Sequence, residues 1–158
     1  AGIKEFDFSN NPNLETINIK GNGVEADLSI FSNLPKLRRL EIGINATWSI
    51  GTSNNFSGSL ASLKNCENLE YLDISYQNEI TGNLLEDLIV PMPKLTEFYC
   101  AGTEFDELLR PSGYNTNDLR LLYQQSIDKK LQLERERQKE KQNHFKKILL
   151  YSFGLFLL

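Results

Sequence analysis

The chain has 158 residues, 40% of them hydrophobic and 24% charged, a composition that suits a globular domain with a core and excludes a disordered or collagen-like chain. Two cysteines and one histidine are too few for a disulfide-stabilised scaffold or a zinc site. The net charge of −4 divides unevenly: residues 1–127 carry 9 basic and 17 acidic side chains, a net of −8, whereas residues 128–158 carry 8 and 4, a net of +4.

A short motif recurs along the acidic part of the chain. FSNNPNL at residues 8–14 is nearly repeated by FSNLPKL at residues 31–37, and LKNCENL and IVPMPKL at residues 63–69 and 89–95 are related to both. Each copy ends at a leucine that opens the pattern L-x-x-φ-x-φ, where φ is apolar. The alternation predicts four short strands, at residues 14–19, 37–42, 69–74 and 95–100.

Two further features follow each predicted strand. Three positions after its last apolar residue stand Asn22, Asn45, Gln77 and Thr103. A second apolar pattern comes next, at residues 24–28, 56–60, 80–84 and, more loosely, 105–109. Three motifs that keep their order in four copies indicate internal repeats.

In these motifs residues 1–111 resemble the leucine-rich-repeat family, whose consensus is L-x-x-L-x-L-x-x-N. The resemblance implies an α/β fold, a solenoid of about four repeats with a parallel β-sheet on its concave face. Stacked repeats would then share one core, because no single coil can bury its apolar face alone. The resemblance also implies a structural ladder of buried polar side chains at Asn22, Asn45, Gln77 and Thr103, weaker where Asn is replaced.

The second repeat contains an insertion. Leu37 and Leu69 are 32 residues apart, and the excess lies in residues 46–55, which are rich in Ser, Thr, Asn and Gly. This composition predicts a loop that leaves the repeat, and it holds the only tryptophan, Trp48. Loops on rigid scaffolds often carry function, so Trp48 is a candidate partner contact. The alternative is that its ring covers the underside of its own loop.

Alternate positions of the predicted strands would line the exposed concave sheet. Neighbouring strands lie about 4.8 Å apart, so Arg39 should stand beside Tyr71 and Glu41 beside Asp73. Tyr and Arg are enriched where binding energy is concentrated in interfaces. The predicted partner-binding residues are Arg39, Glu41, Tyr71, Asp73, Glu97 and Tyr99. The alternative is a solvated scaffold on which Arg39 compensates the two central carboxylates.

The sequence gives little support for catalysis. Residues 21–26, GNGVEA, match a dinucleotide fingerprint, but that motif must open a helix and here the repeat pattern continues instead. The only histidine, His144, lies in the charged tail, and Glu41 with Asp73 lacks a third metal ligand. We therefore expect a non-enzymatic protein without a catalytic, cofactor or metal site and without a nucleic-acid partner. A nucleotide-binding enzyme fragment is a remote alternative.

Both cysteines fall in inward apolar columns of the repeat. Cys66 and Cys100 are therefore expected to be small buried hydrophobic residues, and their different columns make a mutual disulfide unexpected. This favours a reducing compartment. Two glycosylation sequons, at Asn45 and Asn55, point the other way, although Asn45 falls in the predicted ladder.

The repeat domain is expected to end at residue 113, after which the pattern changes. Residues 114–127 are predicted as a C-terminal cap and the start of a helix, with Asn117 as N-cap and Leu119, Leu121 and Leu122 covering the last repeat. Residues 128–147 are basic, no glycine or proline occurs from residue 119 to residue 147, and residues 132–142 are polar all round. They predict a solvated helix, with a weak coiled coil as the alternative because apolar a and d positions are missing.

Residues 148–158 are nearly all apolar. Eleven helical residues extend about 16 Å, half of the roughly 30 Å of a bilayer core. One interpretation is a transmembrane helix of which the sequence, as a fragment, holds only the first part; the basic flank then predicts repeats on the cytoplasmic side. The other is an interfacial anchor on anionic lipid. We expect a cytoplasmic protein-interaction module, membrane-associated through residues 128–158; the alternative is a tethering protein whose tail drives membrane or oligomer association.

Overall fold

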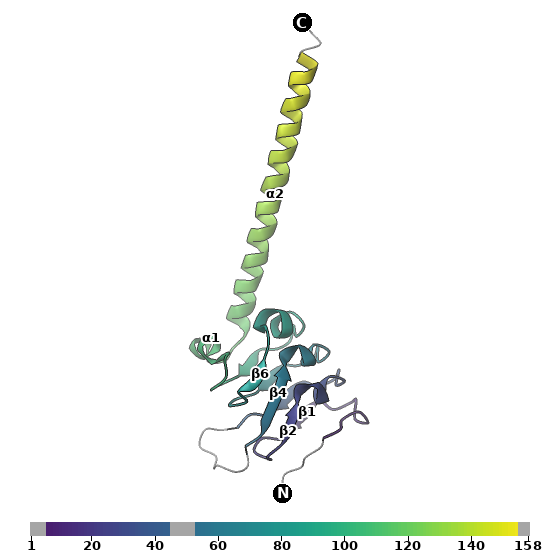
Figure 1. Cartoon of the computed structure of the whole chain (residues 1–158), viewed down its shortest axis with the longest axis vertical. Coiled ribbons are helices and arrows are strands. Elements are labelled where there is room, and N and C mark those ends of the chain that lie inside the picture. Colours follow the sequence, from purple (N-terminus) through teal and green to yellow (C-terminus); the bar gives the residue numbers. More distant parts are fainter. Residues whose placement is uncertain (1–5, 45–52, 155–158) are drawn as a thin grey trace. The chain divides into compact units, whose positions relative to one another are not determined.

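The computed structural model describes residues 6–44 and 53–154. It is a mixed α/β structure with parallel strands in two sheets and a long C-terminal helix (Figure 1). The chain divides into two compact units, residues 1–120 and residues 121–158. The mixed α/β class and the parallel strands predicted from the sequence are confirmed.

The first sheet is made of the predicted L-x-x-φ-x-φ runs. Its strands are β1 (Thr16–Asn18), β3 (Arg39–Glu41), β5 (Tyr71–Asp73) and β7 (Glu97–Tyr99), in the order β1-β3-β5-β7. All neighbours are parallel, and their register places Thr16, Arg39, Tyr71 and Glu97 in one row across the sheet. The pairing expected from the aligned motifs is therefore confirmed.

The second apolar pattern forms a second parallel sheet. Its strands are β2 (Glu25–Asp27), β4 (Asn55–Ser59) and β6 (Glu79–Thr81), which lie side by side in Figure 1. Each continues into a short helical turn: η1 (Leu28–Phe31), η2 (Leu60–Leu63) or η3 (Leu84–Ile89). Asp27, Ser59 and Asn83 cap these turns, because each side chain accepts a hydrogen bond from the backbone N–H two residues further on. In the fourth copy α1 (Asp106–Leu109) and η4 (Arg110–Ser112) take this place.

The core lies between the two sheets. Leu40, Leu72 and Phe98 enter it from the first sheet, Phe56 from the second sheet and Leu60 from η2; all five are fully buried. Aromatic rings also stack along the molecule, with centroid distances of 5.6 Å for Phe8 and Phe31 and 5.7 Å for Phe31 and Phe56.

Both cysteines are buried free thiols, as expected. Burial raises the pKa of Cys66 to about 11 and that of Cys100 to about 12. The nucleophilic thiolate is therefore scarcely populated at neutral pH. The two residues act as small apolar side chains of the core.

Residues 114–120 close the β7 edge of the first sheet. Phe98 N–H donates to the carbonyl of Tyr114, and Thr116 N–H donates to that of Thr96. Leu119 is buried, as predicted. The guanidinium of Arg120 donates to three carbonyls, at Ile89 (2.6 Å), Met92 and Leu95 (2.9 Å).

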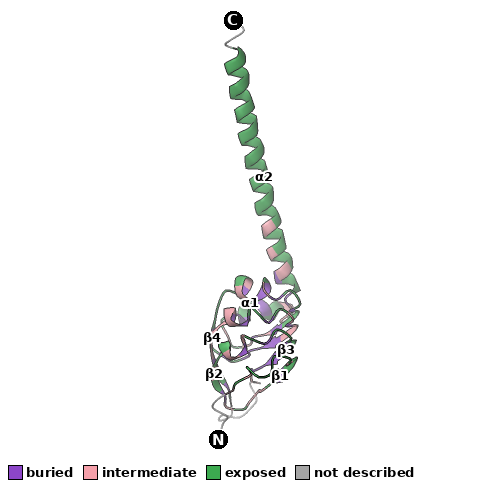
Figure 2. Ribbon diagram, turned by 90° about the vertical axis from the view of Figure 1, so that its right-hand side faces the viewer, coloured by how far each residue is buried: buried purple, intermediate pink, exposed green. Residues whose placement is uncertain are grey.

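The long helix α2 (Asn117–Gly154) begins one residue earlier than predicted and continues through the apolar segment. Asn115, and not Asn117, supplies the capping side chain, because it accepts from Asn117 N–H at 2.8 Å. Leu121 and Leu122 are exposed, and the expectation that they cover the last repeat stays a prediction. Residues 121–154 are exposed almost throughout (Figure 2). Of the helices described, none is both long enough and apolar enough to cross a bilayer.

Candidate binding surface

Alternate residues of the first sheet project away from the core and form what we call the polar sheet face. Its members are Thr16, Asn18, Lys20, Arg39, Glu41, Tyr71, Asp73, Glu97 and Tyr99. The parallel register sets Arg39 beside Tyr71 and Glu41 beside Asp73, as expected from the sequence. All six predicted partner-binding residues therefore belong to one face.

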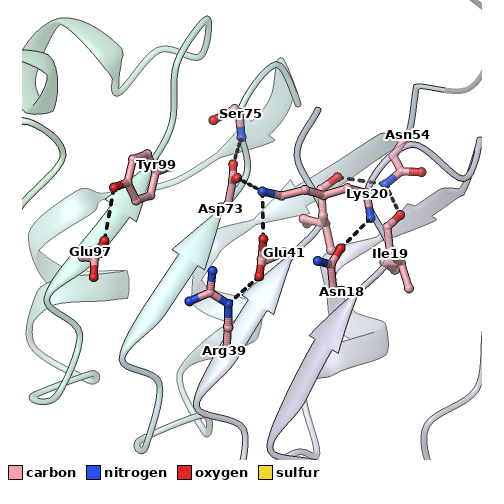
Figure 3. Close-up of polar contacts among 11 residues, drawn as sticks. Asn18, Ile19, Lys20, Arg39, Glu41, Asn54, Asp73, Ser75, Glu97 and Tyr99 are labelled. Atoms are coloured by element: carbon pink, nitrogen blue, oxygen red, sulfur yellow. Dashed lines mark hydrogen bonds and ion pairs between the residues drawn. The ribbon is translucent and has the colours of Figure 1, made fainter. Parts of the chain in front are cut away.

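A compact ion cluster lies at the centre of this face (Figure 3). Lys20 Nζ is 2.8 Å from Glu41 Oε2 and 2.5 Å from Asp73 Oδ2, and Arg39 Nε also pairs with Glu41. Asp73 Oδ1 accepts from Ser75 N–H at 2.9 Å. Glu41 and Asp73 are only 8% and 6% exposed, so the expectation that both carboxylates are open to a partner is wrong.

Gly43 makes room for the cluster. A Cβ atom at this position would lie 2.4 Å from Asp73 Oδ1 and 2.6 Å from the Ser75 nitrogen, closer than Cβ contacts in proteins. Because residue 43 is glycine, the Asp73 side chain rests directly on the neighbouring backbone. Lys20, which follows strand β1, extends past β3 to reach Asp73.

Glu41 and Lys20 keep their charges at neutral pH. Burial, the largest single influence, raises the pKa of Glu41, but hydrogen bonds from Arg39 and Lys20 together outweigh it and leave the pKa below its usual value. Burial likewise lowers the pKa of Lys20, and Asp73 with Glu41 reverses this, so the lysine pKa is raised. A general acid or base works best with a pKa near the operating pH. The pKa of Glu41 is lowered and that of Lys20 is raised, so both are moved further from neutrality. Within the described ranges no three His, Cys, Asp or Glu side chains are placed to hold a metal ion.

Aromatic side chains extend from the cluster across the rest of the face. The Arg39 guanidinium carbon lies 3.7 Å from the centroid of the Tyr71 ring. The ring centroids of Tyr71 and Tyr99 are 5.2 Å apart, and those of Tyr99 and Tyr114 are 5.4 Å apart. We call these three residues the tyrosine row. Arg39 therefore stacks on one end of an ordered and partly exposed aromatic array.

The repeat pattern does not predict Tyr114, because it follows the last strand and has a φ of +65°. A buried carboxylate fixes its position. Asp106 accepts hydrogen bonds from the Tyr114 hydroxyl (2.8 Å), from Gly102 N–H (2.9 Å) and from Arg110. The Arg110 guanidinium, followed by Gly102 N–H and the Tyr114 hydroxyl, holds the pKa of Asp106 well below its usual range. The anchor of the row is thus ionised at neutral pH.

The polar ladder behind the face differs from the prediction. Asn54, only 5% exposed, makes four hydrogen bonds with the backbone. Its Oδ1 accepts from Asn22 N–H (3.2 Å) and Val24 N–H (3.0 Å), and its Nδ2 donates to the carbonyls of Ile19 (2.8 Å) and Ile42 (2.9 Å). Asn54 therefore bridges two successive passes of the chain, the role expected of Asn22 and Asn45.

Of the residues predicted for the ladder and described by the structure, Gln77 links two passes of the chain, whereas the side chains of Asn22 and Thr103 bond locally. Asn22 is exposed, and its side-chain amide donates to the nearby carbonyl of Lys20. Gln77 is 1% exposed and accepts from Phe56 N–H at 2.8 Å, which links two passes as a ladder should, while its Nε2 has no hydrogen-bond partner among the described residues. Thr103 bonds only locally, to Cys100 and Phe105. Asn45 and the candidate loop residue Trp48 lie outside the described residues.

The glycines of the possible dinucleotide motif form a turn. Gly21 and Gly23 have φ values of +66° and +63°, and strand β2 follows them. A dinucleotide fingerprint must open a helix whose N-terminus receives the pyrophosphate. Residues 21–27 do not have that geometry.

Comparisons of the chain with protein-family models, curated proteins and solved structures gave no match. The argument for a function therefore depends on the geometry of the polar sheet face and on the character of helix α2.

Proposed function

We propose that residues 1–113 form a leucine-rich-repeat solenoid that binds a protein partner through the polar sheet face, without catalysis. Two parallel sheets built from motifs that recur in fixed order support the repeat assignment. The observation that carries the binding role is the stacking of Arg39 on the tyrosine row. These are the side chains most often found where binding energy is concentrated.

The array is also well ordered before any partner arrives. Arg39 is held by Glu41 and Tyr71, and the hydroxyls of Tyr99 and Tyr114 donate to Glu97 and Asp106. Ordering a flexible side chain at an interface costs about 0.5–1.5 kcal/mol, and much of that ordering has already occurred here. The tyrosine row therefore offers rigid contact area at low entropic cost.

Substitution of Arg39 and Tyr71, which lie at one end of the aromatic array, should weaken partner capture. In the variant Arg39→Glu with Tyr71→Ala the guanidinium and its stacking ring are both lost, and we expect at least about tenfold weaker capture. Neither side chain is in the apolar core, so the variant should keep its fold, although loss of the Arg39–Glu41 pair should lower its melting temperature modestly. Capture is measured by quantitative pull-down of endogenous partners with wild-type and variant proteins at equal concentration.

Lys64→Glu provides the control, since Lys64 is exposed beyond η2 and lies outside the polar sheet face. This variant should capture partners as the wild type does. Unaltered capture by the Arg39→Glu, Tyr71→Ala variant would remove the polar sheet face from the binding site.

We propose as a second candidate that the tail tethers the protein to a membrane. Helix α2 passes without interruption from a basic stretch into exposed apolar residues, including Ile148, Leu150, Tyr151 and Phe153, directly after Lys146 and Lys147. Basic residues near a bilayer surface each contribute about 1 kcal/mol on anionic lipid, and apolar side chains add to this by insertion. A tail anchored in this way, with its basic flank, would keep the repeats on the cytoplasmic side.

Removal of residues 128–158 should abolish membrane association. The deletion lies outside the compact unit of residues 1–120, so that unit keeps all its own residues. We expect the full chain, but not the shortened one, to sediment with vesicles of phosphatidylcholine and phosphatidylserine, and added salt should weaken the association. Sedimentation of the shortened chain would contradict the tethering role.

A further inference from the structure

We infer that the polar sheet face accepts a basic segment of its protein partner, and that it selects arginine over lysine. The inference rests on the proposed binding function and specifies the chemistry of the partner. It depends on the charges of the face, on Glu97 and on the tyrosine row.

The basic groups of the face are already engaged. Lys20 pairs with Glu41 and Asp73, and Arg39 pairs with Glu41. Two cations and two carboxylates balance within this cluster, which leaves little attraction for an acidic partner. Lys20 and Arg39 are therefore not free anion receptors.

Glu97 is the carboxylate of the polar sheet face that lies outside this balanced cluster. It is exposed, and its Oε2 accepts a hydrogen bond from the Tyr99 hydroxyl at 3.2 Å. Across the described ranges, no Lys, Arg or His nitrogen lies within ion-pair distance of it. A cation from a partner would neutralise this charge at the edge of the tyrosine row.

The charge of the whole repeat region acts in the same direction. Residues 1–120 contain 9 basic and 17 acidic side chains, a net of −8. Attraction of this kind extends over about 8 Å at physiological ionic strength, so it guides a basic segment toward the surface and disfavours an acidic one.

The tyrosine row explains the preference for arginine. Arg39 already shows that a guanidinium stacks on a ring of this row while it pairs with a neighbouring carboxylate. The planar guanidinium can make both contacts at once, whereas the compact and strongly hydrated ammonium of lysine makes them poorly. An incoming arginine beside Glu97 and Tyr99 would repeat the arrangement of Arg39 beside Glu41 and Tyr71.

The test measures binding of three fluorescein-labelled peptides to the full chain by fluorescence anisotropy. The peptides have equal length and alternate glycine with arginine, lysine or glutamate. We expect the arginine peptide to bind about threefold or more tightly than the lysine peptide, the glutamate peptide not to bind, and affinity to fall as salt rises. Equal affinity for the arginine and lysine peptides would overturn the selection of arginine.

Variants locate the binding on the surface. Glu97→Gln with Tyr99→Leu should weaken binding of the arginine peptide about fivefold. The matched control is Glu79→Gln, at an exposed position of strand β6 in the other sheet, and it should leave this binding unchanged. An equal loss of affinity in both variants would show that only net charge matters and would overturn the assignment of binding to Glu97 and Tyr99. Near-ultraviolet circular dichroism verifies that each variant keeps its fold.

Two outcomes separate this inference from the broader proposal. If capture of endogenous partners depends on Arg39 and Tyr71 but the arginine peptide does not bind, the inference fails and the binding function stands. If a peptide of residues 128–147 binds more tightly than the arginine peptide and the full chain self-associates, the occupant is a second copy of this chain, which would overturn the assignment to a separate partner.

Discussion

Replacement of Asn54 by alanine should lower the free energy of unfolding by about 4 kcal/mol. The substitution removes the partner of two backbone N–H groups, at Asn22 and Val24, and of two carbonyls, at Ile19 and Ile42. A buried polar group left without a partner costs roughly 1–3 kcal/mol, and the sum is reduced where water reaches the groups at the surface. Urea unfolding followed by near-ultraviolet circular dichroism measures the change, because four of the six tyrosines, Tyr71, Tyr76, Tyr99 and Tyr114, belong to residues 1–120.

The adjacent residue provides a matched control. Asn55 is exposed at the start of β4, and Asn55→Ala should change the free energy of unfolding by less than about 0.5 kcal/mol. Equal destabilisation by the two substitutions would show that the effect belongs to the local backbone and not to the Asn54 hydrogen bonds.

Lys20→Met should destabilise the protein by about 2 kcal/mol at pH 7. The substitution leaves Glu41 with Arg39 alone and leaves Asp73 without its cation, although both carboxylates remain buried beside each other. Removing one partner of a fully buried pair costs about 3–5 kcal/mol, and the estimate is lower here because the Lys20 side chain is 30% exposed.

The stability lost in Lys20→Met relative to the wild type should depend on pH. In the wild type the pKa of Glu41 lies below its usual 4.5, so ionisation of this group stabilises the fold above that pH, and the contribution is lost as the pH falls through the folded-state pKa. In Lys20→Met protonation of Glu41 removes a negative charge that has lost its lysine. The difference in unfolding free energy between the two proteins should therefore narrow as the pH falls below about 4.5.

A double variant tests the origin of the effect. Lys20→Met with Asp73→Asn removes one cation and one carboxylate together, and it should recover part of the stability lost in Lys20→Met. A deficit that is constant with pH and unchanged by Asp73→Asn would assign the effect to packing of the lysine stem.

The sequence predicted the parts of the fold that follow from hydrophobic alternation. Aligned leucines and isoleucines gave the register of β1, β3, β5 and β7, because a shift of one residue would turn every apolar side chain out of the core. The same columns predicted the burial of Cys66 and Cys100. The extended helix was also predicted, from a long stretch without glycine or proline.

The features that were missed depend on contacts between passes of the chain. Counting forward from β3 pointed to Asn45, whereas counting back two residues from Val24 and Phe56 would have identified Asn22 and Asn54 as equivalent. Burial of Glu41 and Asp73 depends on the reach of Lys20 and on the missing side chain of Gly43, and a one-dimensional pattern records neither. Tyr114 joins the row through a turn with positive φ, outside any repeat.

The position of Asn54 has a consequence for engineering. The chain leaves the first sheet at Ile44, whose N–H donates to the Ser75 carbonyl, and it is fixed again at Asn54 by four hydrogen bonds. Both residues form these hydrogen bonds with described parts of the two sheets and their turns, and the entropic cost of lengthening a chain between two fixed points grows only slowly. A foreign peptide grafted between these residues could therefore be displayed by the protein without disturbing the pairing of strands in either sheet.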